Sequence, residues 1–353
     1  MRPAKVIQTT LRILGWSIVA VVVVILAVFG TLFLYFSNLP WAWARLVLAV
    51  AFVAATIGLF VFLKPRWKAT AAFFALYALL VVWYVLIPAS NDRAWQPDVA
   101  QTPSAEIDGD TLTVHNVRDF RYRSVEDYDV NWETRTYDLS TLQSLDYFFS
   151  YWGSTTIAHT MLSFGFADGR YLCISVETRK EIGETYAPIR SFFKQFELVY
   201  ILGDERDLVA LRTNHRREDV YLFPTREDPA RIRALLLDIL ERANSLARRP
   251  EYYRTIRDNC TTSLLGHIDR VADEPTPFSL ALILNGYMPE QAYQRGRFES
   301  DAPFAEVKQQ YAISARAQAL PSLDDFSRQI RAGLGAPIRE RQPVRPPAGE
   351  RSP

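Results

Sequence analysis

Three long apolar stretches, separated by short polar segments, occupy the first quarter of the chain. No charged residue lies between Ile13 and Ala44, and the run ILGWSIVAVVVVILAVFGTLFLYF exceeds the roughly 20 residues that cross a bilayer core. The runs LVLAVAFVAATIGLFVFL and ATAAFFALYALLVVWYVLI follow, with KPRWK between them. The first run is longer than the apolar core of a cleaved signal peptide. The pattern therefore predicts a three-helix transmembrane anchor within residues 1–90.

Basic residues that flank these stretches indicate their orientation. Those before the first stretch or between the second and third are Arg2, Lys5, Arg12, Lys64, Arg66 and Lys68. Arg45 lies on the other side, near a helix end where its side chain can extend to the interface. The positive-inside rule then places the N-terminus in the cytoplasm and the chain after about Ser90 outside. Because the stretches contain no acidic residue or histidine, we interpret them as an anchor rather than a transport path.

Beyond the anchor, the chain reads as one mixed domain between two irregular segments. Residues 91–110 are rich in Pro, Ser and Asp and are interpreted as a linker. Residues 111–336 carry alternating strand patterns and helical patterns, which predict an α+β domain with a mixed or antiparallel sheet. Residues 337–353 are rich in Pro and Arg and are expected to be a disordered tail.

Within this domain the local patterns predict individual elements. TLTVHNV, FELVYIL and DVYLF are expected as strands, and YDLSTLQSLDYFFSYWG as a short helix or loop. DPARIRALLLDILERANSLARR has apolar residues at helical spacing with Pro229 in its first turn, so it is expected as a helix. Another helix is expected to begin near Asn259.

A hairpin is predicted where TIAHTMLSFGF and RYLCISVET flank the turn sequence ADG. If this turn has three residues with Gly169 left-handed, each cross-strand pair sums to 336 and His159 lies opposite Glu177. Opposed side chains have Cβ atoms about 5 Å apart, which suits a carboxylate that orients an imidazole. A two-residue turn would shift the register by one and break this pairing. Ser175 lies on the same face and is the weaker candidate for the orienting role.

Composition and motifs exclude several functions. Lys and Arg total 40 and Asp and Glu total 39, so no single-sign field indicates nucleic acid as a partner. No Cys, His and carboxylate cluster has zinc-site spacing, and no Gly-rich phosphate loop or G-x-S-x-G sequence is present. We therefore expect neither a metal nor a cofactor.

One of the two cysteines, Cys260, follows Asn259 at the expected start of a helix. The partial positive charge there favours a thiolate, and backbone N–H groups can stabilise an oxyanion. A small buried residue and a disulfide to Cys173 are the alternatives. A nucleophilic thiol needs a base, and His267 lies two helical turns away, roughly 10 Å along the axis. His159 is the better candidate.

Several blocks of the sequence resemble one family. They are WETRTYDLSTLQSLDYFFSYWGSTTIAHTMLSFGF, SVETRKEIGETY, LRTNHRREDVYLF, IRDNCTTSLLGHI and NGYMPEQAYQRG. Together, over Trp95 to Gly296, they resemble the Lnb N-terminal periplasmic domain family. The order of a histidine on a strand and a later cysteine at a helix start is similar to circularly permuted papain-like enzymes of the NlpC and lecithin–retinol acyltransferase type.

This resemblance implies a thiol acyl-transfer enzyme on the periplasmic side of a bacterial inner membrane. Cys260 would be the nucleophile, His159 the base and Glu177 the orienting acid. Candidate site-lining residues are Asn259, Arg179, Ser175, Tyr252 and Trp152. The family's named member resembles a lipoprotein N-acyltransferase, which implies a phospholipid acyl donor and a lipoprotein acceptor. Papain-like cell-wall peptidases or amidases, and a non-enzymatic envelope-assembly factor, are the alternative functions.

Overall fold

The computed structural model describes residues 3–277, 279–282, 284–298, 300 and 302–334. These residues form two compact units. The anchor unit consists of described residues within 1–90 together with segments 184–197 and 251–254. The sheet unit contains the other described residues.

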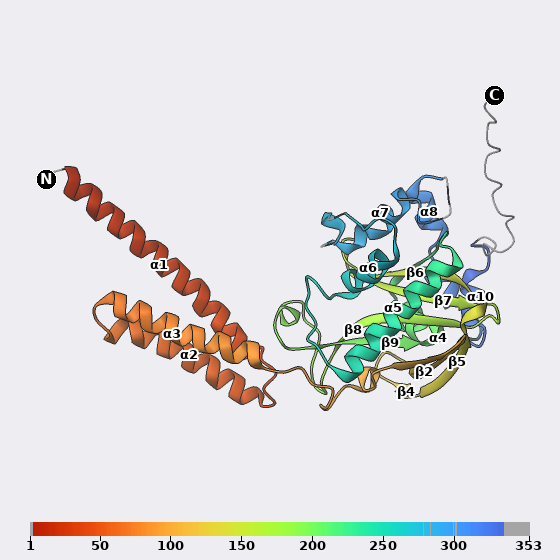
Figure 1. Ribbon diagram of the computed structural model, residues 1–353, viewed down its shortest axis with the longest axis horizontal. Coiled ribbons are helices and arrows are strands. Elements are labelled where there is room, and N and C mark those ends of the chain that lie inside the picture. The colour runs from red at the N-terminus through yellow and green to blue at the C-terminus, as the bar shows by residue number, and fades with distance from the viewer. Residues whose placement is uncertain (1–2, 278, 283, 299, 301, 335–353) are drawn as a thin grey trace, which may run out of the picture. The chain divides into compact units, whose positions relative to one another are not determined.

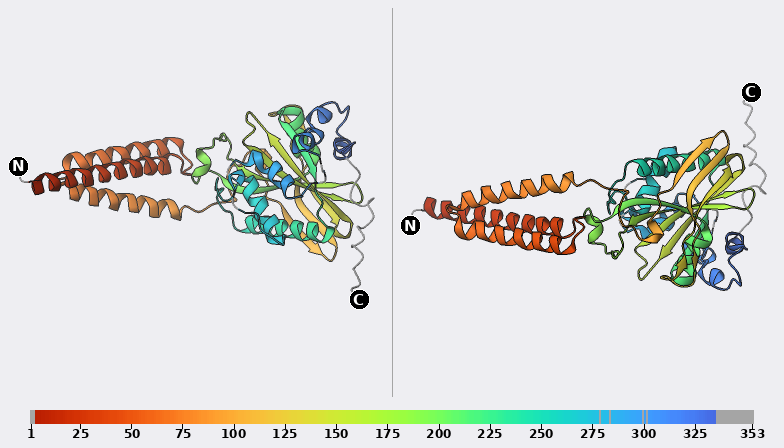
Figure 2. Two further views of the ribbon diagram at one scale, coloured as in Figure 1. Left: turned by 90° about the horizontal axis from the view of Figure 1, so that it is seen from above. Right: turned by 90° about the horizontal axis from the view of Figure 1, so that it is seen from below.

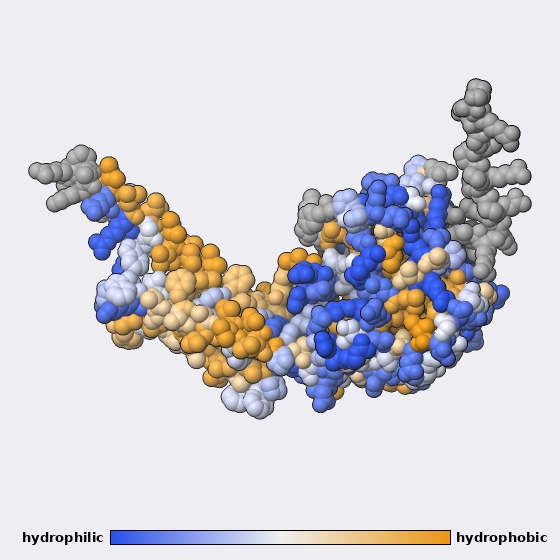
Figure 3. Space-filling view, viewed as in Figure 1, coloured by the Kyte–Doolittle hydropathy of each residue, from blue (hydrophilic) through white to orange (hydrophobic). Residues whose placement is uncertain are grey.

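The anchor unit contains three helices, α1 (Pro3–Tyr35), α2 (Ala42–Phe62) and α3 (Arg66–Leu86). All three are long and apolar enough to cross a membrane, so the predicted spans are confirmed. The helices contact one another through a small core that includes Phe52 and Phe73. Most of their large apolar side chains point outward, and Figure 3 shows the resulting apolar surface along the helices. Such a surface requires a lipid environment.

Two short segments from later in the sequence complete the anchor unit. The ring of Phe193 stacks on Phe36 with 5.3 Å between centroids. The backbone N–H of Lys194 donates to Tyr84 Oη at 2.6 Å, and the Tyr252 hydroxyl donates to the Pro88 carbonyl at 2.7 Å. The ends of the membrane helices are therefore packed against chain that directly adjoins the sheet unit in sequence.

The sheet unit is built on an eight-stranded sheet in the order β1-β2-β9-β8-β7-β6-β10, with β5 also paired to β2 (Figure 1). Its strands are β1 (Ser104–Asp108), β2 (Thr111–Arg118), β5 (Trp132–Asp138), β6 (Leu142–Tyr151), β7 (Ala158–Phe166), β8 (Tyr171–Arg179), β9 (Glu197–Gly203) and β10 (Asp219–Pro224). A separate two-stranded sheet pairs β3 (Arg121–Tyr122) with β4 (Tyr128–Asp129). The β2–β9 contact is parallel and the β6–β7 and β7–β8 pairs are antiparallel, so the sheet is mixed.

Helices and helical turns cover this sheet. The α-helices are α4 (Glu205–Ala210), α5 (Pro229–Arg248), α6 (Cys260–Val271), α7 (Met288–Gln294), α8 (Phe304–Gln310), α9 (Ser314–Gln318) and α10 (Phe326–Arg331). The short turns are η1 (Pro97–Val99), η2 (Leu139–Thr141), η3 (Arg190–Phe192), η5 (Leu280–Leu282), η6 (Asn285–Tyr287) and the π-helical η4 (Leu211–His215). The expected α+β class is confirmed.

The two faces of the sheet have different covers, as the two views of Figure 2 show. Helices α5 and α6 pack against β6 and β7 on one face. On the other face, Ser163 donates to Glu205 of α4, and Arg331 of α10 forms an ion pair with Asp146 of β6 at 2.6 Å. Central strands buried on both faces explain why β7 is apolar without clear alternation.

Two expectations from the sequence are wrong or incomplete. Residues 142–151, expected as a short helix or loop, form strand β6, which pairs with β7 and β10 and is covered by α5 on one face and α10 on the other. Asp138 caps the turn η2, where its side chain accepts the Ser140 N–H. The proposed linker, 91–110, contains strand β1, which pairs with β2 around Gly109. The expected tail, 337–353, lies outside the described residues.

Candidate active site

Helix α6 begins at Cys260 because Asn259 caps it. The Asn259 side chain accepts the N–H groups of Thr261 and Thr262, and the Thr262 hydroxyl accepts the Asn259 N–H at 3.0 Å. This reciprocal capping box satisfies donors that every helix start leaves without an intrahelical partner. Cys260 is thereby held in the first position of the helix, where the partial positive charge is greatest.

His159 lies near the start of β7, on the hairpin that the sequence predicts. Gly169 has a left-handed φ of 84°, and the Phe166 N–H donates to the Arg170 carbonyl at 3.0 Å, which defines a three-residue turn. The observed pairs run from Gly165↔Tyr171 to Met161↔Ser175, so the predicted register is present in this ladder. Continuing this register brings His159 beside Glu177, and their side chains are 3.3 Å apart.

The ladder between β7 and β8 ends at Met161 and Ser175, although both strands extend further. Just beyond this point the Thr160 hydroxyl hydrogen-bonds that of Thr261 in the first turn of α6. Helix α6 contacts both strands here. The start of α6 thus lies beside these strands, and Cys260 is close enough to His159 to interact with it electrostatically.

A chain of hydrogen bonds leads away from the imidazole. His159 Nε2 is 2.7 Å from Ser175 Oγ, and the Ser175 hydroxyl donates to Glu177 Oε1 at 2.6 Å. Because the serine proton is directed at the carboxylate, Nε2–H is the donor to Ser175. Arg212 donates to the same carboxylate oxygen at 2.9 Å. This arrangement holds the proton on Nε2 and leaves Nδ1 for the thiol.

Charge in this cluster favours a thiolate–imidazolium pair. Burial by itself lowers the pKa of His159, but the Glu177 carboxylate and the Cys260 thiolate together outweigh it and raise the pKa to about 9. Burial raises the pKa of the Cys260 thiol, and the His159 charge with its hydrogen bonding reverses this and lowers it. Burial also raises the pKa of Glu177, yet His159 and Arg212 hold it well below its usual range. Cys173, buried in β8, has a pKa raised well above that of an ordinary thiol by desolvation.

Hydrogen bonds on the other side of the thiol fix β7 against α6. Thr160 Oγ1 and Thr261 Oγ1 are 2.8 Å apart. Asn285 in η6 donates to Thr261 Oγ1 and to the Ala158 carbonyl, each at 2.7 Å, and accepts the Ala158 N–H at 2.9 Å. The segments that carry the nucleophile and the base are therefore connected through one amide side chain.

A family comparison covers all of these residues. Residues 128–286 match the model of the Lnb N-terminal periplasmic domain. The resemblance read from the sequence is confirmed over this range. No curated protein and no solved structure shows a significant match to the chain. The chain thus joins three helices able to span a membrane to a domain similar to the Lnb N-terminal periplasmic domain, and Cys260, His159, Glu177 and Asn285 all lie inside the matched segment.

Other candidate residues of the Lnb segment have different surroundings. Ser175 contacts the imidazole more closely than Glu177 does, although the sequence makes it the weaker candidate. Asn259 acts as the helix cap. Arg179 donates to the carbonyls of Val99 and Ala100 and lies over the Trp95 ring, so these contacts hold the segment before β1.

The last two candidate site-lining residues, Tyr252 and Trp152, have surroundings of their own. Tyr252 belongs to the anchor unit, where its hydroxyl donates to the Pro88 carbonyl. Trp152 follows β6, two positions after Ser150, and is 47% exposed. Neither residue has a described contact with Cys260 or His159.

Sequence reasoning missed Arg212, Thr160, Thr261 and Asn285. Arg212 lies in the block LRTNHRRED and Asn285 begins NGYMPEQ, so both stand in blocks that carry the family resemblance. A buried arginine on a π-helical turn is a further signal, since such turns are frequent at functional sites. Among the described residues, no group of three or more His, Cys, Asp or Glu side chains is arranged to hold a metal ion.

Proposed function

We propose that this protein is a membrane-anchored cysteine acyltransferase that works through an acyl-thioester on Cys260. The observation that carries the proposal is the buried pair of Cys260 and His159, whose pKa values are moved in opposite directions. A thiol with a lowered pKa beside a protonated imidazole is the activated form of a cysteine nucleophile. The order of histidine strand followed by cysteine helix supports a circularly permuted papain-like arrangement.

In the first half-reaction the Cys260 thiolate attacks the carbonyl carbon of an ester. The bond between that carbon and the ester oxygen breaks, and His159 gives its proton to the departing alkoxide. The N–H of Cys260 is the natural oxyanion donor, because Asn259 already accepts the N–H groups of the next two residues. In the second half-reaction an amine attacks the thioester, the bond between carbon and sulfur breaks, and His159 takes the amine proton, so that an amide is released and the thiolate–imidazolium pair is restored.

Glu177, Ser175 and Arg212 act as positioning residues in this proposal. Glu177 and Ser175 hold the imidazole with Nδ1 toward the sulfur and stabilise its positive charge. Arg212 keeps Glu177 ionised. This division of roles follows the general logic of a nucleophile, a base and a group that orients the base.

The membrane anchor and the family resemblance support the choice of substrates. A domain held at a bilayer has phospholipid esters as its nearest acyl donors, and the resemblance implies the amino terminus of a lipoprotein as acceptor. The basic residues support a cytoplasmic N-terminus in a bacterial inner membrane, with the catalytic domain in the periplasm. The division into an anchor at 1–90 and a catalytic domain within 111–336 belongs to the same proposal.

The decisive experiment traps the covalent intermediate. The full-length protein in membranes is incubated without acceptor, and Cys260 peptides are analysed by mass spectrometry. We expect a fatty acyl mass on wild-type Cys260, none on Cys260→Ala, and no change with Cys173→Ala as matched control. Transfer activity should fall by at least about a thousandfold in Cys260→Ala. A muropeptide mass on Cys260 would support a cell-wall peptidase instead, and full activity of Cys260→Ala would refute both enzymes.

A further inference from the structure

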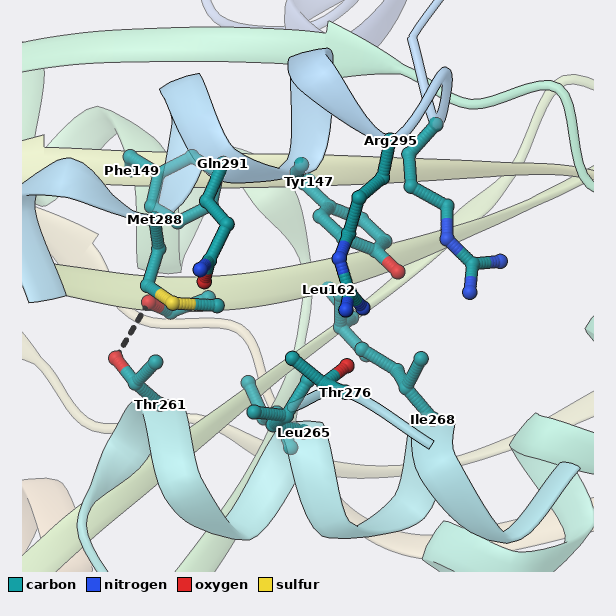
Figure 4. Close-up of a pocket in the computed structure, with 14 residues that line it drawn as sticks. Tyr147, Phe149, Leu162, Thr261, Leu265, Ile268, Thr276, Met288, Gln291 and Arg295 are labelled. Carbon is teal, nitrogen blue, oxygen red and sulfur yellow. Dashed lines mark hydrogen bonds between the residues drawn. The ribbon is translucent and has the colours of Figure 1, made fainter. Parts of the chain in front are cut away.

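An apolar cleft lies between strands β6 and β7 and helices α6 and α7 (Figure 4). Its walls include Phe149, Leu162, Leu265, Ile268 and Met288. Leu265 and Ile268 are only partly buried, and Figure 4 shows both pointing from α6 toward the strands. The apolar face of α6 is therefore left partly uncovered along this cleft.

One end of the cleft adjoins the nucleophile. Thr160 and Thr261 line this end and are joined by a hydrogen bond between their hydroxyl groups; Figure 4 labels Thr261 at the start of α6. Thr261 Oγ1 is 3.9 Å from Cys260 Sγ. From Thr261 to Ile268 helix α6 advances by roughly 10 Å. A chain bonded to the sulfur and turned past the threonine pair would thus run along apolar side chains for two helical turns.

The chemistry of the walls discriminates between ligands. None of the described residues that line the cleft is acidic, and its polar groups are few. A bound peptide would leave backbone N–H and C=O groups without partners here, which is costly, whereas a polymethylene chain needs none. At the far end the exposed Arg295 lines the cleft, and Figure 4 shows its side chain extending from the end of α7 along the wall.

We infer that this cleft binds the hydrocarbon of a long fatty acyl chain while its carbonyl is held at Cys260. The inference rests on the proposed acyl transfer and names its substrate class. Burial of successive methylene groups against Leu162, Leu265 and Ile268 selects long chains over short ones. The chain can arrive as part of a membrane phospholipid or as a free fatty acid, since the cleft contacts only the hydrocarbon.

The test separates binding from catalysis. Full-length Cys260→Ala protein in nanodiscs is irradiated with a palmitic acid analogue that carries a mid-chain diazirine, and crosslinked peptides are mapped. A second arm uses phosphatidylglycerol with the same chain. Crosslinks on α6 and α7 at the cleft are expected. Labelling by both probes means that the chain alone is recognised, and labelling by the phospholipid only means that its headgroup is required as well.

Two variants narrow the cleft without touching the thiol. Leu265→Trp is expected to reduce cleft crosslinking about tenfold, the equivalent of removing roughly two methylene groups from apolar contact. Ile268→Trp provides the same test one turn further along, should the first variant fold poorly. Ile107→Trp on β1, at an apolar residue that is 49% exposed and outside the cleft lining, is the matched control and should change nothing.

In the Cys260-containing protein, Leu265→Trp should lower the ratio of lauroyl to butyryl ester turnover about tenfold. Crosslinks spread over other surfaces, together with an unchanged ratio, would overturn the inference. If the cleft is labelled in Cys260→Ala but wild-type Cys260 never carries an acyl group, the cleft stands as a lipid site and the proposed transferase fails.

Discussion

Two buried histidines of the sheet unit each contact a hydroxyl group and a carboxylate, yet one is protonated and the other neutral. His159 lies against Ser175 and Glu177, whereas His267 on α6 lies 2.8 Å from the Tyr200 hydroxyl and 2.5 Å from Asp238. Burial lowers the pKa of His159, but Glu177 and Cys260 together raise it to about 9. Burial lowers the pKa of His267 to about 4, and nearby arginines support this shift against the attraction of Asp238.

The difference comes from the charges next to each ring. The nitrogen of His267 that faces Asp238 is also 2.6 Å from Arg270 Nη2, so a positive charge adjoins it. His159 instead adjoins a thiol whose anion stabilises the imidazolium. A carboxylate beside its ring is therefore not enough to make a histidine a catalytic base. The net charge around the imidazole, and a nucleophile within reach, distinguish a catalytic histidine from a structural one.

The largest effect is expected from removing each imidazole in turn. His159→Gln should slow acylation of Cys260 by about a hundredfold to ten-thousandfold, because it removes the proton acceptor and the stabilising cation. His267→Gln should leave the rate within a few-fold. Both are measured by mass spectrometry of Cys260 acylation in folded protein. Equal losses of acylation rate in the two variants would show that His159 has no catalytic role that His267 lacks.

The pH dependence of stability should reveal the neutral histidine. A free histidine has a pKa near 6.5, so as the pH falls from about 6.5 to 4 the unfolded chain takes up a proton at His267 that the folded chain resists. The free energy of unfolding should therefore fall by about 2–3 kcal/mol more in wild type than in His267→Gln. Thermal unfolding at a series of pH values measures this, and parallel curves would contradict it.

Neutralising each carboxylate should have a smaller effect. Glu177→Gln is expected to slow acylation about tenfold and to move the alkaline limb of its pH profile to lower pH, since the pKa of His159 falls without the carboxylate. Asp238→Asn is the matched control at the other histidine and should leave the profile unchanged. An unshifted limb in Glu177→Gln would show that Glu177 does not set the charge of His159.

Removing the hydroxyl group that contacts each histidine should have the smallest effect on acylation. Ser175→Ala is expected to slow acylation only a few-fold, because Glu177 Oε1 is already 3.3 Å from Nε2 and can take over the contact. Tyr200→Phe should cost about 1 kcal/mol of stability and leave acylation intact. A loss from Ser175→Ala as large as that from His159→Gln would instead make Ser175 indispensable for orienting the ring.

Local sequence determined much of this protein. An uninterrupted apolar run has to lie in lipid, so the three spans follow from composition alone. The turn Ala167–Asp168–Gly169 accommodates a left-handed glycine, and one turn choice sets the whole β7–β8 register. Asn259 before Cys260 likewise marks a helix start, because capping is satisfied within three residues.

Only the tertiary structure decided the rest, because the remaining contacts join residues far apart in sequence. Strand β6 escaped prediction since helices packed on both faces of the sheet bury it and erase its alternation. Arg212 reaches Glu177 across 35 positions and Asn285 reaches Ala158 across 127, and no local pattern encodes such pairs. The different protonation states of His159 and His267 also depend on neighbours that folding brings together, so the fold determines which of the four histidines can act as a base.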